Sequence, residues 1–245
     1  MSIVRHARQV LVAALLALAG CGEVVIMQPG PEPGAPVQAP APQAPTSGID
    51  VSRARTFQAV VNRVMPIAQQ ECRTRTRGVR CDYAVVVDDR PGLPPNAFQS
   101  LGPGGQPVVG FTLPLIQTAA NADEMAFVLG HEAAHHIEGH IARGQASAAT
   151  GAVLAGALAT LGGGDAVTIQ RAQNLGAFYG SRRFSKDFEL EADALGTVIS
   201  QRAGYDPVRG VAYFNRVPDP GNRFLGTHPP NADRIALVRR VAAGQ

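Results

Sequence analysis

The chain contains no tryptophan, and aromatic residues make up only 5% of its 245 residues. Proteins that bind single-stranded nucleic acid stack bases on aromatic side chains, so this chain has little with which to build such a surface. The formal net charge is small, +3 from 22 basic and 19 acidic residues. Removing Arg5 and Arg8, which lie in an acid-free N-terminal stretch, leaves 20 basic against 19 acidic residues. The composition therefore argues against nucleic acid as a partner.

Charged residues are also few, at 17%, whereas hydrophobic residues make up 45%. This balance excludes a wholly disordered chain, because it supplies enough apolar surface for a core. The N-terminal apolar run, residues 10–19, is shorter than the roughly 20 residues that a membrane-spanning helix needs. It follows Arg5, His6 and Arg8, which is the layout of a secretory signal, with a buried helix as the alternative.

The apolar run ends in LAGC, residues 18–21, which closely resembles the lipobox of bacterial lipoproteins. The resemblance implies a signal peptide over residues 1–20, cleavage before Cys21 and lipidation of that cysteine. The next residue is Gly22 rather than aspartate, which implies sorting to the outer membrane of a Gram-negative cell envelope, facing the periplasm. More than one acyl chain would make such an anchor stable.

Proline is concentrated after this cysteine, with seven prolines in the 21 residues 28–48. A proline-rich stretch without hydrophobic periodicity stays extended and solvated, and in polyproline II form it would reach about 60 Å. We therefore expect residues 21–48 to be a lipidated tether and residues 49–245 to form the folded domain.

Cysteine is scarce, with three residues in all. If the anchor uses Cys21, then Cys72 and Cys81 remain, and in an oxidising compartment we expect a disulfide between them. Two free buried thiols are the alternative. A zinc site built on this pair is disfavoured, because no histidine or third cysteine lies nearby in the sequence.

The hydrophobic pattern of the folded part predicts an α+β domain that is mostly helical. Short strands are expected at 83–87, 96–98 and 108–112, and Pro107 favours an edge position for the last of them. The expected helices are 52–71, one that begins after Asn121, 185–203, and one that follows Pro229 and Pro230.

Residues 146–164 are uncharged and consist mostly of alanine and glycine. Their number would allow a membrane span, but the only large side chains are those of Val153, Leu154, Leu158 and Leu161. We expect a buried or loosely ordered helical hairpin, with contact to a membrane surface as the alternative.

Residues 131–135 read HEAAH within the helix that follows Asn121. Positions i and i+4 share one helix face, so His131 and His135 can bind one zinc ion. Glu132 is then placed to accept a proton from the attacking water. Solvated histidines on an exposed helix are the alternative explanation of this motif.

Two histidines leave a zinc ion one protein ligand short. Glu189 and Asp193 are separated by one helical turn, so one could bind the metal while the other orients a histidine. Spacing alone leaves Glu191 open as the ligand.

At this point the sequence resembles the gluzincin endopeptidase family of CAAX prenyl protease 1 and the HtpX heat-shock protease. The resemblance spans residues 50–240 and rests on HEAAH, on ELEAD at 189–193 and on THPP at 227–230. It extends to the periplasmic branch of BepA- and LoiP-like lipoproteins. It implies that Glu189 is the third zinc ligand and that Asp193 lies behind the ligands, and it places Arg234 near the cleft.

The resemblance also implies roles for two further histidines, His140 and His228. His140, nine residues after His131, is expected behind the ligands or at the helix end. His228 would either bind the zinc and inhibit the enzyme, or stabilise the oxyanion that forms during the reaction. A turn residue without a catalytic role is the alternative for His228.

The resemblance implies a metalloendopeptidase with one zinc ion per chain and with unfolded or misassembled envelope proteins as substrates. We expect the substrate to lie along residues 108–112 as an edge strand. One alternative is a chaperone-like factor for outer-membrane protein assembly with a self-inhibited zinc site. A pure binding protein, however, has no need of Glu132. The other alternative, a cell-wall zinc amidase, is disfavoured because ELEAD and the His-Pro loop are features of the peptidase family.

Overall fold

The computed structural model describes residues 50–221 and 228–245. The expected signal peptide, the lipidation site Cys21 and the tether lie outside the described residues. Within the described ranges, no helix combines the length and the apolar character that crossing a bilayer requires.

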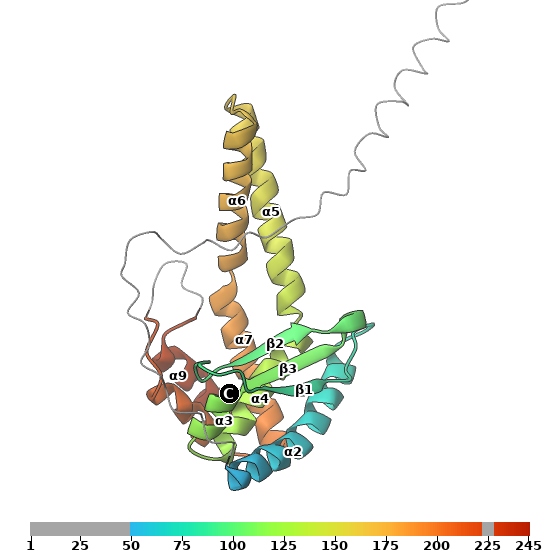
Figure 1. The fold of residues 1–245 in the computed structure, drawn as a ribbon, viewed down its shortest axis with the longest axis vertical. Coiled ribbons are helices and arrows are strands. Elements are labelled where there is room, and N and C mark those ends of the chain that lie inside the picture. The colour runs from blue at the N-terminus through green and yellow to red at the C-terminus, as the bar shows by residue number, and fades with distance from the viewer. Residues whose placement is uncertain (1–49, 222–227) are drawn as a thin grey trace, which may run out of the picture. The chain divides into compact units, whose positions relative to one another are not determined.

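The fold is α+β and mostly helical, as expected, with a small sheet formed early in the chain (Figure 1). The elements are α2 (Val51–Arg75), β1 (Ala84–Asp88), β2 (Ala97–Leu101), η1 (Pro103–Gly105), β3 (Pro107–Thr112), α3 (Leu113–Thr118), α4 (Ala122–Ile137), α5 (His140–Leu161), α6 (Ala166–Arg182), α7 (Ser185–Arg202), α8 (Pro207–Gly210), η2 (Val211–Asn215) and α9 (Asn231–Ala242).

The sheet has the strand order β1-β3-β2, so the prediction that residues 108–112 form an edge strand is wrong. β3 pairs in parallel with β1 and antiparallel with β2. Pro107 is compatible with the central position because it is the first residue of β3, where a missing N–H interrupts no inner part of the ladder. Among the described residues, the edge strands are therefore β1 and β2.

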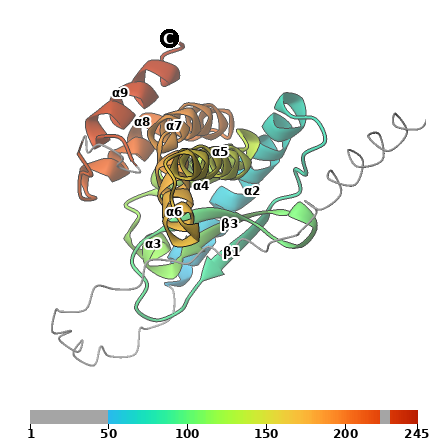
Figure 2. The same ribbon diagram turned by 90° about the horizontal axis from the view of Figure 1, so that it is seen from above.

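Helix α4 lies at the centre of the domain, with the sheet on one side and α7 on the other (Figure 2). Asn121 caps it by accepting a hydrogen bond from the Glu124 N–H at 3.0 Å. The Glu124 carboxylate accepts from the Ala120 N–H and pairs with Arg216, so the start of α4 is fixed from both sides. Most of α4 is buried, and most of its apolar side chains form one core with α2, β3 and α7, while Phe127 packs with Val211, Phe214 and Val238.

Two glycines allow α4 and α7 to touch backbone to backbone. A Cβ at Gly130 would lie 2.9 Å from the Gly196 carbonyl oxygen, and one at Gly196 would lie 2.8 Å from the His131 nitrogen. No larger residue fits at this crossing without a shift of one helix. Because Glu189 and Asp193 precede Gly196 by about two turns and one turn, the crossing brings both acids to the face of α4 that carries His131.

The loop before β1 is tied to the rest of the domain by a disulfide and by two hydrogen bonds. Cys72, near the end of α2, is bonded to Cys81, with their Cα atoms 5.7 Å apart. His136 donates to the Arg80 carbonyl at 2.7 Å, and the Tyr83 hydroxyl donates to the Ala133 carbonyl at 3.1 Å. The two hydrogen bonds tie this loop to the C-terminal half of α4.

Helices α5 and α6 pack on each other and extend away from the sheet as a two-helix arm (Figure 1). The uncharged segment 146–164 supplies only the first helix of this hairpin, since α5 runs from His140 to Leu161 and α6 follows the turn. The expectation of a buried hairpin is wrong, because α6 has no buried residue and α5 has only His140 and Gly156.

Candidate metal centre

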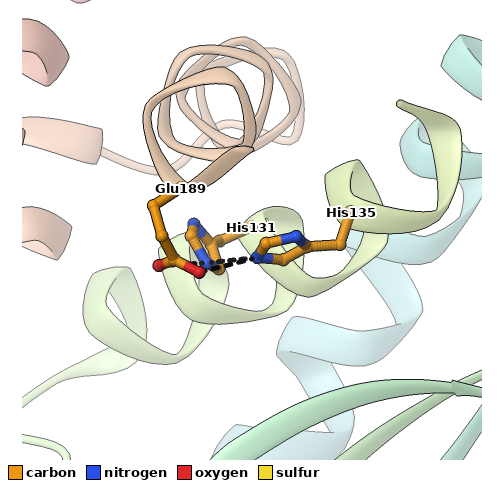
Figure 3. A group of neighbouring side chains, drawn as sticks. All are labelled: His131, His135 and Glu189. Carbon is orange, nitrogen blue, oxygen red and sulfur yellow. Dashed lines mark hydrogen bonds and ion pairs between the residues drawn. The ribbon is translucent and has the colours of Figure 1, made fainter. Parts of the chain in front are cut away.

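Three side chains converge where α4 meets α7. His131 and His135 project from α4, and Glu189 projects from α7 (Figure 3). The Nε2 atoms of the two histidines are 3.0 Å apart. They lie 3.6 Å and 3.5 Å, respectively, from the two carboxylate oxygens of Glu189. Among the described residues, these are the three whose ligand atoms come close enough together to hold one ion.

The opposite nitrogen of each histidine has a partner of its own. His131 donates its Nδ1–H to Asp193 Oδ1 at 2.9 Å. His135 donates its Nδ1–H to His140 Nδ1 at 2.7 Å, and His140 in turn donates its Nε2–H to Glu191 at 3.0 Å. These bonds fix the tautomers, so both Nε2 atoms present lone pairs to the space between the ligands.

Two imidazole lone pairs and a carboxylate therefore face one another, an arrangement that a cation stabilises. Tetrahedral zinc with bonds of about 2.0–2.1 Å places its ligand atoms about 3.3 Å from one another. The observed separations of 3.0–3.6 Å bracket this value. Burial lowers the pKa of His135 to about 3, so this imidazole is neutral, as a metal ligand must be. The residues present thus fit a zinc ion.

Arg234 of α9 holds the two acids of α7 in place. Its Nε and Nη2 donate to the two oxygens of Asp193 at 2.6 Å and 2.7 Å, and Nη2 lies 3.2 Å from Glu189. Arg234 is itself buried, with its guanidinium 3.9 Å from the ring centre of Phe214. Burial alone would raise the pKa of Asp193, but hydrogen bonds from Arg234 and His131 outweigh it and lower the pKa.

Glu189 also remains ionised. Burial would raise its pKa, but the hydrogen bond from His228 and the positive charge of Arg234 hold it well below the usual value. His228 lies in the segment before α9, with its Nδ1 3.2 Å from Glu189 and its side chain half exposed. In this structure His228 contacts a ligand residue without joining the group of ligand atoms.

Glu132 follows His131 on α4. Burial raises the pKa of its carboxyl to about 7. A carboxyl whose pKa lies near neutrality can both accept and release a proton at physiological pH. The centre therefore combines three side chains that could hold a metal ion with an adjacent carboxyl of raised pKa.

The sequence profile of peptidase family M48 matches residues 52–242. The chain belongs to peptidase family M48. Members of this family are metallopeptidases, so the triad and Glu132 lie in the domain that gives the family its activity. Narrower membership, in the branch of CAAX prenyl protease 1 and HtpX or in a lipoprotein branch, stays a prediction.

Individual M48 relatives come from eukaryotes and bacteria. The mitochondrial metalloendopeptidase OMA1 of Saccharomyces cerevisiae is 31% identical over 170 residues, which cover 64% of this chain and 46% of that protein. OMA1 of Arabidopsis thaliana is 31% identical over 163 residues, which cover 65% of this chain and 31% of the relative.

A bacterial relative is the beta-barrel assembly-enhancing protease of Escherichia coli K12. It is 29% identical over 144 residues, which cover 52% of this chain and 29% of the relative. The chain thus spans less than half the length of these curated relatives.

A set of residues behind His135 was not predicted as a unit. The carboxylate of Glu191 accepts from His140 and also from the guanidinium of Arg143, with Nη2 at 3.1 Å. The His140 ring stacks on the Phe188 ring with centroids 4.5 Å apart, and the Arg143 guanidinium lies 4.4 Å from the centre of the Phe188 ring. The family resemblance placed His140 behind the ligands or at the helix end, but the sequence carried no signal that paired His140 with Glu191 on another helix.

Proposed function

We propose that this M48 member is a zinc-dependent endopeptidase whose metal is held by His131, His135 and Glu189. The observation that carries the proposal is the convergence of three acceptor atoms at the α4–α7 contact, where the opposite nitrogens of both histidines are already occupied. One zinc ion per chain would complete this set of ligands.

Each residue has a separate task in the reaction. When bound, zinc polarises the scissile carbonyl and makes water more acidic. The Glu132 carboxylate takes a proton from the attacking water and returns it to the leaving amine, a transfer suited to its raised pKa. Asp193 keeps His131 in the tautomer that presents Nε2, and Arg234 holds Asp193 and Glu189 in register.

An extended substrate would bind along β2 rather than along β3. β2 is an edge strand in the described sheet and packs near α4, whereas β3 is paired on both sides. The unpaired backbone groups of an edge strand can hydrogen-bond to a peptide in extended conformation. Such binding would present the peptide backbone to Glu132, the residue after His131 on α4.

The cellular setting is proposed from the N-terminal sequence and from the relatives. Residues 1–20 would be a signal peptide, Cys21 the lipidated residue and 21–48 a tether to the outer membrane, which leaves residues 49–245 as a peptidase domain in the periplasm. A relative named as a beta-barrel assembly-enhancing protease supports envelope proteins as the substrate class, and unfolded or misassembled forms expose the extended segments that β2 could bind.

The direct test compares the wild-type protein with Glu132→Gln in cleavage of unfolded casein, with zinc content measured in parallel. Glu132→Gln should retain zinc and lose nearly all cleavage, because the ligands remain and the proton acceptor is gone. Glu138→Gln, at the end of the same helix, is the matched control and should cleave like wild type. Casein cleavage by Glu132→Gln at the wild-type rate would reject the proposed mechanism.

A second candidate function is a chaperone-like assembly factor with a self-inhibited site, and the position of His228 favours it. His228 Nδ1 lies 3.2 Å from Glu189, within a short movement of the ligand atoms. If His228 closes the site, His228→Ala should cleave casein faster than wild type. If it instead stabilises the oxyanion, the rate should fall on the order of 10²-fold with zinc retained.

A further inference from the structure

The arm formed by α5 and α6 has its large side chains on the outside. Val153, Leu154, Leu158 and Leu161 of α5 are 68%, 61%, 70% and 85% exposed. Helix α6 adds exposed apolar side chains at Val167, Leu175 and Phe178. Such a concentration of exposed aliphatic groups marks a contact surface rather than ordinary scatter.

The contact between the two helices is made instead by small residues. A Cβ at Gly151 would lie 2.1 Å from the Gly176 carbonyl oxygen, and one at Gly180 would lie 2.2 Å from that of Ser147. Ser147 and Gly151 on α5 and Gly176 and Gly180 on α6 are each four residues apart. In water, a hairpin gains stability by burying leucine and valine between its helices. Small residues inside and large ones outside are the arrangement of helices that pack in an apolar solvent.

The outer half of α5 and the turn after it offer almost no polar group to a protein partner, whereas the outer half of α6 exposes Thr168, Gln170, Arg171 and Asn174. Between residues 151 and 164 the one polar side chain is that of Thr160, and its hydroxyl donates to the Gly156 carbonyl of its own helix. A specific protein interface carries hydrogen bonds across its area, whereas lipid acyl chains require none. The α5 side of the arm therefore suits lipid better than a folded partner.

Charge on the arm fits an anionic bilayer. From Gly144 to Arg183 the charged residues are Asp165 and three arginines, Arg171, Arg182 and Arg183. Arg171 lies five residues after the start of α6, about 8 Å along the helix axis. An apolar segment inserted about 5–10 Å into the headgroup boundary would leave that guanidinium level with the lipid phosphates.

We propose that the tip of the α5–α6 arm inserts shallowly into the surface of an anionic phospholipid bilayer. The proposal goes beyond the peptidase activity and rests on the tether proposed above only for proximity, because a lipid at Cys21 would keep the domain within reach of the bilayer. Asp165 opposes insertion, since its carboxylate, which caps α6 through the Thr168 N–H at 2.8 Å, lies at the turn of the arm.

The absence of tryptophan allows a direct test with the full lipidated chain. Leu158→Trp places the sole tryptophan on the arm, and Val86→Trp places it at an exposed site on β1 as the control. Both proteins are anchored in vesicles of phosphatidylethanolamine and phosphatidylglycerol, with and without brominated acyl chains. We expect a blue shift and the loss of most emission by bromine quenching for Leu158→Trp, and neither for Val86→Trp.

Adding Asp165→Asn to Leu158→Trp should increase the quenching, because asparagine can still cap α6 but carries no charge. Replacing phosphatidylglycerol by phosphatidylcholine should reduce it, and equal quenching in both vesicles would overturn the assignment to anionic lipid. Equal quenching at positions 158 and 86 would overturn insertion of the arm.

Other occupants of the arm surface give different results. A blue shift without vesicles that grows with protein concentration would assign the surface to a second copy of the chain and overturn the proposal. A shift caused by unfolded casein alone would assign it to substrate and likewise overturn it. The intact mass of the purified chain reports lipidation of Cys21 separately, and casein cleavage without vesicles reports the peptidase, so failure of either is distinguishable from failure of the arm.

Discussion

Around the metal centre, leucine, isoleucine and phenylalanine side chains point inward, and the buried charges are paired with one another. In the arm, which begins at the next helix along the chain, the leucines and valines point outward and the helices meet through glycine. Both regions use close backbone contact between two helices, at Gly130 with Gly196 and at Gly151 with Gly176. The difference lies in what surrounds that contact: a packed protein core in one case and an open surface in the other.

The largest effect is expected from removal of the third ligand. Glu189→Gln should lose most of its zinc after dialysis, because a neutral amide replaces the one anionic ligand of the triad. Metal analysis of the purified protein measures this. Glu191→Gln is the matched control, and it should keep its zinc because the amide oxygen can still accept from His140. Equal zinc contents in the two variants would contradict the assignment of Glu189.

In the core around α4, removal of a buried side chain should cause a large loss of stability. Leu129 is fully buried on α4. Leu129→Ala should reduce the free energy of unfolding by about 2–5 kcal/mol, because it removes buried methyl groups and leaves a cavity. Urea unfolding followed by circular dichroism gives the value. A change below the lower end of that range would mean that the α4 core is less tightly packed than the structure indicates.

A smaller effect is expected at the junction of the two regions, where His140 begins α5 and supports His135. His140→Ala should weaken zinc binding by about 10–100-fold, because the Nδ1–H of His135 loses its acceptor. Competition with a chelator measures the affinity, and the absorption spectrum of the cobalt-substituted protein reports the ligand geometry.

His140→Asn should recover part of this affinity, because its side-chain oxygen can replace the lost acceptor. His136→Ala is the matched control, since His136 bonds to the Arg80 carbonyl instead of to a ligand. A loss of stability in His140→Ala with unchanged zinc affinity and cobalt spectrum would show a purely structural role.

The smallest effect is expected in the arm. Leu158 is exposed, so Leu158→Ala should change the free energy of unfolding by less than about 0.5 kcal/mol in the absence of lipid. The same urea experiment, run beside Leu129→Ala, tests the contrast between the two regions. A loss comparable to that of Leu129→Ala would show that the arm buries this side chain in solution.

Local signals in the sequence predicted much of the site. HEAAH, the Asn121 cap and the apolar spacing of α7 act within one or two helical turns, and each helix formed within a few residues of its expected bounds. The structure also brings Glu189, Asp193 and Arg234 to the histidines, as the family resemblance implied. Their roles as ligand and supporting residues remain predictions until metal is measured.

The features that were missed depend on contacts between distant residues. Proline at the first residue of a central strand reads like proline on an edge strand, so the sequence could not decide the position of β3. His140 and Glu191 are 51 residues apart, and nothing in either local pattern pairs them. The partner of α5 is α6, which contains ordinary polar residues such as Arg171 and Gln173, so its hydrophobic pattern did not reveal a hairpin of this length.

The Cys72–Cys81 bond determines what happens when another protease cuts the chain between the two cysteines. The segment between the two cysteines contains Arg73, Arg75, Arg77 and Arg80, all of them exposed. A trypsin-like cut after any of these arginines would leave α2 covalently joined to the remainder of the domain. Such a nicked molecule would migrate as one chain on a non-reducing gel and as two fragments once the disulfide is reduced.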